Sequence, residues 1–384
     1  MKLFRRTAPF LIAACLVFLT GCWDYQEVEN LYIVSGMAVD TGSNGYKYHT
    51  TFEVLDLSSS GTAQDGGGQK SKLIESEGDS IADSVKNATQ VSDKALYFND
   101  CKVVIFSRQL ANQGLTPVLD WLNRDPEPRF TIQVFISAEK TAGELLKPLG
   151  KQTGIVAYQI ASSMDGCAAS GRAPEVRLYQ LDDVLLGEGK ELWLPALSRV
   201  QLKDVPQIGI NGAAVFIGDR YVGMRTEAQT RGDMYLTHSF ESGLLLVGMD
   251  HSQRNIALEI QRSEANTKVL QTGTVPGMQV SVKMDCIFNE ENTPHNYLTE
   301  LGVQKFESRA NDFLSWRAEN VLKEMQSTYA SDIYGFGRRV YETDPALWKK
   351  LKPNWRETFR NLKIGISVDV HINNTGYAYP KGSG

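Results

Sequence analysis

The sequence predicts a mixed α/β (α+β) protein of three domains, the last an antiparallel or mixed sheet covered by long helices. Helical and strand patterns alternate up to about residue 186, and strand patterns then dominate as far as residue 217. In the last third, two alternating segments flank a long amphipathic segment. A chain of 384 residues has room for two or three domains. We expect an N-terminal α/β domain at 22–204, a small strand-rich middle region at 205–230 and a C-terminal α+β domain at 231–384.

Composition and spacing place the elements of the N-terminal domain. Aromatic and β-branched residues predict strands at 46–57, 102–107 and 131–137. Apolar residues at helical spacing predict helices at 80–91 and 110–122. Small and polar residues at 58–71 predict a surface loop between two of these elements.

The C-terminal domain has the clearest pattern. Apolar residues occupy every second position from Met278 to Phe288 and from Ile364 to Ile372, which places one face of each strand on a core and the other in water. Between them, apolar residues recur every three or four positions over 298–325. This spacing predicts a helix of roughly 30 residues on the apolar face of the sheet. Pro345 after Asp344 predicts the start of a short, capped helix.

The N-terminus has the organisation of a lipoprotein signal peptide over residues 1–21. Three basic residues precede an uncharged run from Ala8 to Leu19, which is too short for the roughly 20 residues of a membrane-spanning helix. The next residues, Leu19-Thr20-Gly21-Cys22, resemble the lipobox of bacterial lipoproteins. There the cysteine receives a diacylglyceryl group and the preceding peptide bond is cut. An uncleaved signal anchor is the alternative.

A diacylglyceryl group on Cys22 would hold the chain on a membrane without crossing it, because two acyl chains anchor stably where one does not. Loss of the basic signal takes the net charge from −5 to −8. An acidic chain has no footprint for nucleic acid and no basic arm for anionic lipid heads. Attachment is therefore expected from the lipid and from partner proteins.

Side chains that would indicate an enzyme or a cofactor site are not grouped in this sequence. The five histidines are scattered without metal-ligand spacing, and no GxSxG motif occurs. Cys101, Cys167 and Cys286 form no CxxC pair, and we interpret them as small core residues, with one disulfide among them as the alternative. We therefore expect no catalytic residues, no metal and no cofactor besides the lipid.

Two charged segments are candidates for partner binding. Arg124 and Asp125 open the segment RDPEPR, which follows a helix and precedes a strand. The alternative is a rigid turn whose charges pair locally. Glu227 and Arg231 lie at a predicted strand-to-helix junction. The alternative to partner binding there is a structural role, in which Thr230 or Asp233 caps the helix.

Four blocks of the sequence carry a family resemblance. The segments are CWDYQEVENLYIVSGMAVD from Cys22, LDWLNRDPEPR from Leu119, GAAVFIGDRYVGMRTEAQTRGDMYL from Gly212 and SDIYGFGRRVYETDPALWKKLKPNW from Ser331. Together with the lipobox, they resemble the Ger(x)C lipoproteins, which are the C subunits of nutrient germinant receptors in endospore-forming bacteria.

The resemblance implies a non-enzymatic lipoprotein on the outer face of the spore inner membrane. Such a subunit works with A- and B-type integral membrane subunits in the assembly and signalling of a germinant receptor. Trp23 and Asp24, which follow the anchor cysteine, become further candidates for partner contact. The alternative function is a solute-binding lipoprotein that delivers a ligand to a transporter from a cleft between two doubly wound lobes.

Overall fold

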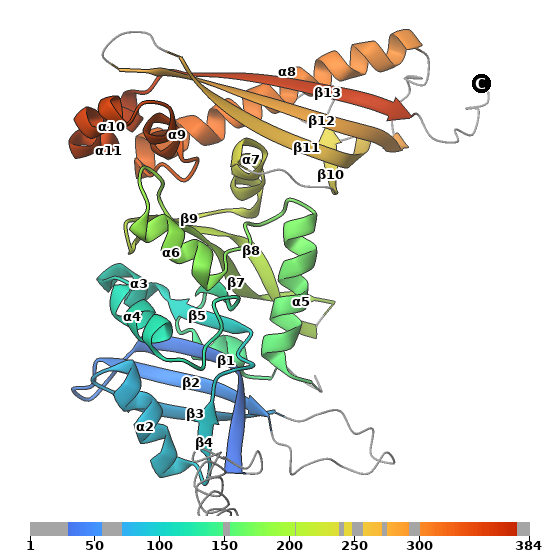
Figure 1. The fold of residues 1–384 in the computed structure, drawn as a ribbon. Helices are drawn as coiled ribbons and strands as arrows, with labels where there is room; N and C mark the ends of the chain where they lie inside the picture. The colour runs from blue at the N-terminus through green and yellow to red at the C-terminus, as the bar shows by residue number, and fades with distance from the viewer. Residues whose placement is uncertain are drawn as a thin grey trace, which may run out of the picture.

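The computed structural model describes residues 30–55, 71–148, 154–203, 205–237, 242–247, 256–270, 275–291 and 300–374. Helices and strands alternate within these ranges, which confirms the predicted mixed α/β class. Figure 1 shows two sheets that follow one another along an elongated molecule. The expected signal peptide, Cys22, Trp23, Asp24 and nearly all of the loop expected at 58–71 lie outside the described residues.

The first sheet has nine strands among the described residues, in the order β3-β2-β1-β5-β6-β7-β8-β9, with β4 beside β1. The central strands β1, β5, β6 and β7 are parallel neighbours, and antiparallel pairs extend the sheet on both sides. The bounds are β1 Leu31–Thr41, β2 Tyr48–Leu55, β3 Ser71–Gly78, β4 Ala95–Tyr97, β5 Val103–Ser107, β6 Gln133–Ser137, β7 Trp193–Leu202, β8 Val205–Ile217 and β9 Arg220–Arg225.

Helices cover both faces of this sheet. Strand β5 shows how the two cores form, because Val104 and Phe106 pack into one core while Val103 and Ile105 pack into the other. A strand between two helical layers has no polar face, so every residue of β5 is buried. The first core holds α2 Ile81–Val91, α3 Arg108–Gln113, α4 Thr116–Arg124 and α6 Leu178–Leu186, and the second holds α5 Val156–Ala169 and the 3₁₀ turn Gly143–Leu146.

Several elements of the N-terminal part differ from the sequence prediction, and strands β1 and β4 were not among those expected. The helix expected at 110–122 is divided into α3 and α4, because the chain turns at Gly114, whose φ is +115°. Strand β3 was not expected. It is an edge strand in which Ile74 is the one buried large apolar residue, so its sequence lacks the alternation of a half-buried strand.

The first sheet also continues beyond the expected domain boundary at residue 204. Strands β7 and β8 form one antiparallel hairpin, in which Leu202 pairs with Val205. The region expected at 205–230 contains β8, β9 and the start of α7. Because β8 and β9 are hydrogen-bonded members of the first sheet, this sheet ends at Arg225.

The second sheet confirms the predicted mixed sheet of the C-terminal domain. Its order among the described residues is β10-β11-β12-β13, with β13 parallel to β12 and the other pairs antiparallel. The alternation predicted for β12 is confirmed, since Met278, Val280 and Val282 are buried in the core below the sheet. The strands are β10 Gly243–Val247, β11 Ile256–Leu270, β12 Gly277–Glu291 and β13 Ile364–Asn374.

The long helix expected at 298–325 is α8 Glu300–Glu324, followed by a π-helical turn at Met325–Tyr329. Its apolar side shares the core of the second sheet through Phe306, Ala310 and Leu314. The same helix also covers the edge of β13. The backbone N–H groups of Val370 and Ile372 donate to Asn311 Oδ1 at 2.7 Å and Glu307 Oε1 at 2.8 Å, so two side chains take the place of a neighbouring strand.

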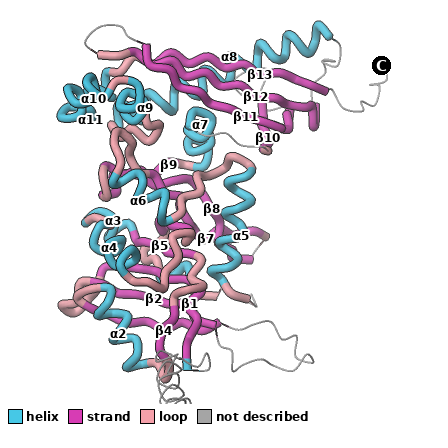
Figure 2. Tube along the Cα trace, in the orientation of Figure 1, coloured by secondary structure: helices cyan, strands magenta, loops and turns pink. Residues whose placement is uncertain are grey.

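Four shorter helices complete the described fold. Helix α7 Glu227–Thr237 lies between the two sheets in Figures 1 and 2. Helices α9 Phe336–Thr343, α10 Pro345–Leu351 and α11 Trp355–Asn361 pack at one end of the second sheet. The predicted cap of α10 is confirmed, since the N–H of Leu347 donates to Asp344 Oδ1 at 2.9 Å.

The three described cysteines are free thiols, which excludes the disulfide kept open as an alternative. Burial raises the pKa of Cys101 and of Cys286 to about 12, so neither thiol ionises at pH 8. We predict that a thiol reagent at pH 8 labels Cys167, which is half-buried, and reaches Cys101 and Cys286 only after unfolding. Peptide mass mapping measures this, and rapid labelling of Cys101 in the native protein would contradict it.

Candidate functional site at the junction of the two sheets

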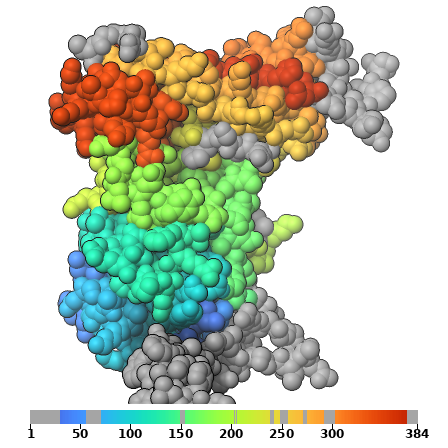
Figure 3. All heavy atoms as spheres, viewed as in Figure 1, coloured from blue at the N-terminus to red at the C-terminus, as the bar shows by residue number. Residues whose placement is uncertain are grey.

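A buried polar network lies where the two sheets meet. Helix α7 directly follows β9, the last strand of the first sheet, and contacts α8 and the strands β11 and β12 of the second. Figure 3 shows orange-red atoms against green atoms at the left side of this junction. Charged side chains at the centre of this junction therefore contribute to holding the two sheets together.

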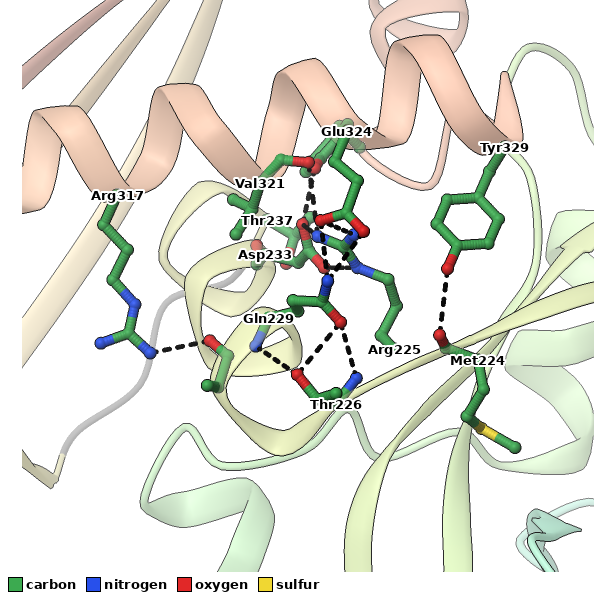
Figure 4. A network of polar contacts seen from close by, with 12 residues as sticks. Met224, Arg225, Thr226, Gln229, Asp233, Thr237, Arg317, Val321, Glu324 and Tyr329 are labelled. Atoms are coloured by element: carbon green, nitrogen blue, oxygen red, sulfur yellow. Dashed lines mark hydrogen bonds and ion pairs between the residues drawn. The ribbon is translucent and has the colours of Figure 1, made fainter.

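Arg225, the last residue of β9, is fully buried at this junction. Its guanidinium donates from Nε to Asp233 Oδ2 at 2.9 Å and from the η2 nitrogen to Asp233 Oδ1 at 3.2 Å. The other η nitrogen lies 2.9 Å from Glu324 Oε2 on α8 (Figure 4). One side chain of the first sheet thus binds a carboxylate on α7 and another on α8.

Neighbouring side chains complete this Arg225 network. Tyr334 donates its hydroxyl to Asp233 Oδ1 at 2.6 Å, and Gln229 donates to both oxygens of Glu324 at 2.8 and 2.7 Å. Tyr329 donates to the carbonyl of Met224 on β9 at 3.0 Å (Figure 4). The contacts therefore link β9, α7, α8 and the segment after α8.

Burial sets the electrostatics of the pair. Loss of solvation raises the pKa of Asp233 to about 6, while Arg225 and the Tyr334 hydroxyl act in the opposite direction. The carboxyl is therefore ionised at neutral pH, where it balances the guanidinium, and takes up a proton as the pH falls through about 6. The attraction of Asp233 raises the pKa of Arg225 against the opposing effect of burial.

A second set of contacts joins the loop between α6 and β7 to the segment around α9. Asp332 is buried and accepts hydrogen bonds from the backbone N–H groups of residues 335, 336 and 337 at 2.8–3.1 Å, and from Trp355 Nε1 at 3.0 Å. From the other side, Trp348 Nε1 donates to Glu188 Oε2 at 2.9 Å. The N–H of Glu191 donates to the carbonyl of Asp332 at 2.9 Å, so both chain segments meet at one aspartate residue.

Two glycines make this second contact close enough to form. The N–H of Arg338 donates to the carbonyl of Gly189 at 2.7 Å. A Cβ on Gly189 would lie 2.2 Å from the carbonyl carbon of Gly337, and φ at Gly189 is +68°. A side chain is excluded here on both grounds.

Arg124 and Asp125 take no part in the junction. Arg124 pairs with Asp120 one turn earlier on α4 at 2.8 Å, and both side chains are exposed. Asp125 accepts from the N–H of Glu127 at 3.0 Å, which is a local turn contact. Arg124 and Asp125 thus make local contacts, whereas Glu127 and Arg129 of the same segment contact Phe98 and Asn99. Helix α4 lies apart from α7 in Figure 1.

Glu227 and Arg231 form an i,i+4 pair on the first turn of α7, with 3.1 Å between Oε1 and the η2 nitrogen. The expected caps are wrong. Thr226 caps α7, since its hydroxyl accepts from the N–H of Gln229 at 3.3 Å while its own N–H donates to Gln229 Oε1 at 2.8 Å. Thr230 and Asp233 lie inside the helix and are buried, because they face the junction.

Known families cover both halves of this architecture. Residues 24–199 match the family described as "Spore germination protein N-terminal domain", and residues 211–376 match "Spore germination B3/ GerAC like, C-terminal". The chain belongs to the GerAC family of spore germinant receptor C subunits. The resemblance found in the sequence is therefore confirmed, and it associates the chain with the spore.

Relatives of this GerAC-family chain match over nearly their whole length. "Spore germination protein KC" of Bacillus subtilis (strain 168) is 25% identical over 398 residues, which cover 95% of each chain. "Spore germination protein GerQC" of Bacillus cereus is 23% identical over 97% of this chain and 99% of its own. The crystal structure of the GerBC protein has a TM-score of 0.59 at 18% identity, covering 88% of this chain and 97% of that one, and supports the fold.

The two family matches end and begin between residues 199 and 211, within the β7–β8 hairpin. The second contact set joins the two family domains, because Gly189 and Glu191 lie in the N-terminal match and Asp332 and Arg338 lie in the C-terminal match. The Arg225 network lies within the C-terminal match, where it ties β9 of the first sheet to α7 and α8. Among the described residues, no three His, Cys, Asp or Glu side chains are grouped so as to hold a metal ion. What the structure places at the junction is a set of contacts that position elements.

We predict that Arg225→Met lowers the free energy of unfolding by about 3–5 kcal/mol, because Asp233 is left as a buried charge without its counter-ion. The double variant Arg225→Met/Asp233→Leu should lose much less than the sum of the single variants. Urea unfolding measures both. Arg231→Met on α7, which breaks a partly exposed ion pair with Glu227, is the control and should cost under about 1 kcal/mol. Equal losses for Arg225→Met and Arg231→Met would contradict the prediction.

We also predict that Gly189→Ala destabilises the protein by about 2 kcal/mol or more, because it adds a clash with Gly337 to the cost of a left-handed alanine. Gly218 is the matched control, since its φ is +57° but no atom lies within 4 Å of the position that an added methyl group would take. Gly218→Ala should cost about 1 kcal/mol. Thermal unfolding compares the two variants, and the same shift in both would refute a close contact at Gly189.

Proposed function

We propose that this chain is the lipoprotein C subunit of a nutrient germinant receptor, held on the outer face of the spore inner membrane by a diacylglyceryl group on Cys22. The observation that carries the proposal is the position of the lipobox. Cleavage before Cys22 gives a mature chain that starts two residues before the family match at residue 24. The start of the family match therefore supports cleavage before Cys22.

In this proposal the subunit works with A- and B-type integral membrane subunits, and its folded body contributes to receptor assembly and signalling. The relatives carry the names of spore germination proteins, which supports a shared role in germination. In the described part of the chain, no helix is both long and apolar enough to span a bilayer.

The geometry favours a receptor subunit over a solute-binding lipoprotein. A solute-binding protein holds its ligand between two doubly wound lobes. Within the described residues, the second sheet has a single parallel pair, β12–β13, and its other pairs are antiparallel. At the junction, α7 and the Arg225 network lie between the two sheets.

We predict that Cys22→Ala lowers the membrane-bound fraction about ten-fold or more, because the acyl chains are lost. Nutrient-triggered germination should fall with it, and so should co-purification with A- and B-type subunits. Cys167→Ala, which removes a thiol elsewhere, is the control and should behave as the wild type. Fractionation of spore membranes measures the outcome, and normal partitioning of Cys22→Ala would contradict the proposal.

A further inference from the structure

The end of the first sheet at which β1 begins carries a group of basic, aromatic and apolar side chains. Pairing of Leu31 with Ala95 and of Leu55 with Ser71 brings the starts of β1, β3 and β4 to the same end of the sheet. Figure 1 places this end opposite the second sheet. We define the β1-end surface by the described side chains Lys72, Val91, Asp93 and Lys94, which lie around the buried Tyr32.

Tyr32 organises the polar part of this surface. The Lys72 ammonium lies 3.8 Å and the Lys94 ammonium 5.3 Å from the centre of its ring, and its hydroxyl donates to Asp93 Oδ1 at 2.7 Å. The side chain of Lys72 is 40% exposed. Two positive charges against one negative charge give the surface a local positive balance on a chain whose net charge is negative.

The apolar part is Val91, the last residue of α2, which is 70% exposed. It precedes Asp93 and Lys94 by two and three residues, so it belongs to the same end of the molecule. An exposed valine beside two lysines suits a membrane interface, where apolar atoms enter and charged tips stay at the headgroups. Tyr32, which is 5% exposed, lies beneath these side chains and holds them in place.

The length of the chain before β1 limits where a membrane can lie. Eight residues, 23–30, separate Cys22 from Leu31 at the start of β1. Even fully extended, the nine Cα–Cα steps from Cys22 to Leu31 span at most about 32 Å. A lipid on Cys22 therefore holds this end of the sheet near the bilayer, whereas the second sheet lies beyond the other edge of the nine-stranded sheet.

We propose that the β1-end surface rests on the membrane that carries the anchor, with Val91 in the interface and Lys72 and Lys94 against anionic headgroups. This inference rests on the proposed lipid anchor at Cys22. It orients the molecule, because it directs α8–α11 and the second sheet away from the bilayer. The β1-end surface then supplies the basic contact that no continuous stretch of the sequence provides.

Spin labels at two exposed positions test the orientation. The lipidated full chain carries either Val91→Cys or Tyr341→Cys, the latter on α9 at the far end, in a Cys167→Ser background. The protein is bound to phosphatidylcholine vesicles with and without phosphatidylglycerol. We expect a lipid-soluble relaxation agent to act on the label at 91, and a water-soluble agent to act on the label at 341.

Charge reversal tests the two lysines. Lys72→Glu/Lys94→Glu should lower the lipid-contacting fraction of the label at 91 by about five-fold or more on phosphatidylglycerol vesicles, since each lysine near an anionic surface contributes about that factor. Lys349→Glu/Lys350→Glu on α10 makes the same charge change at the far end and should leave this fraction unchanged.

The outcomes separate the two proposals. A purified chain that does not bind vesicles at all would overturn the lipid anchor. A chain that binds while the label at 91 stays in water, or while the label at 341 contacts lipid, would overturn the orientation alone. Shielding of the label at 91 from both agents would assign the β1-end surface to a protein contact and would also overturn the inference.

Discussion

The structure depends most on a single buried guanidinium. Arg225 ends the last strand of the first sheet, and its charge is balanced by Asp233 on α7 and Glu324 on α8. A buried charge without a partner costs several kcal/mol. If either helix moved away from β9, the Arg225 guanidinium would lose a counter-ion. The network thereby fixes the second sheet, which packs on α7 and α8, relative to the first.

The second contact set also holds the two sheets together, and it does so through the loop between α6 and β7. Asp332 binds the start of α9, the Trp355 side chain and the backbone of Glu191. Gly189 and Gly337 allow the two backbone segments to approach each other closely. Two separate groups of contacts resist rotation better than one. A body tied in this way suits the proposed receptor subunit, because a force or a displacement at one end is carried to the other.

Local pattern predicted much of this fold, but contacts between distant residues did not follow from it. The alternation in β12 and β13 and the spacing in α8 identified these elements, because each buries one regular face. Edge strand β3 was not predicted, because it has no regular apolar face. Asp233 was noted only as a candidate cap, since its pairing with Arg225 and Tyr334 requires α7 to be packed in place. Lys72 and Lys94 both lie near the ring of Tyr32, which precedes them by 40 or more residues, so no local pattern predicts this contact.

Calorimetry of the full mature chain tests the central claim, that the junction makes the two sheets one cooperative unit. The account predicts a single unfolding transition whose calorimetric and van 't Hoff enthalpies agree. Two transitions, one for each sheet with its helices, would contradict it.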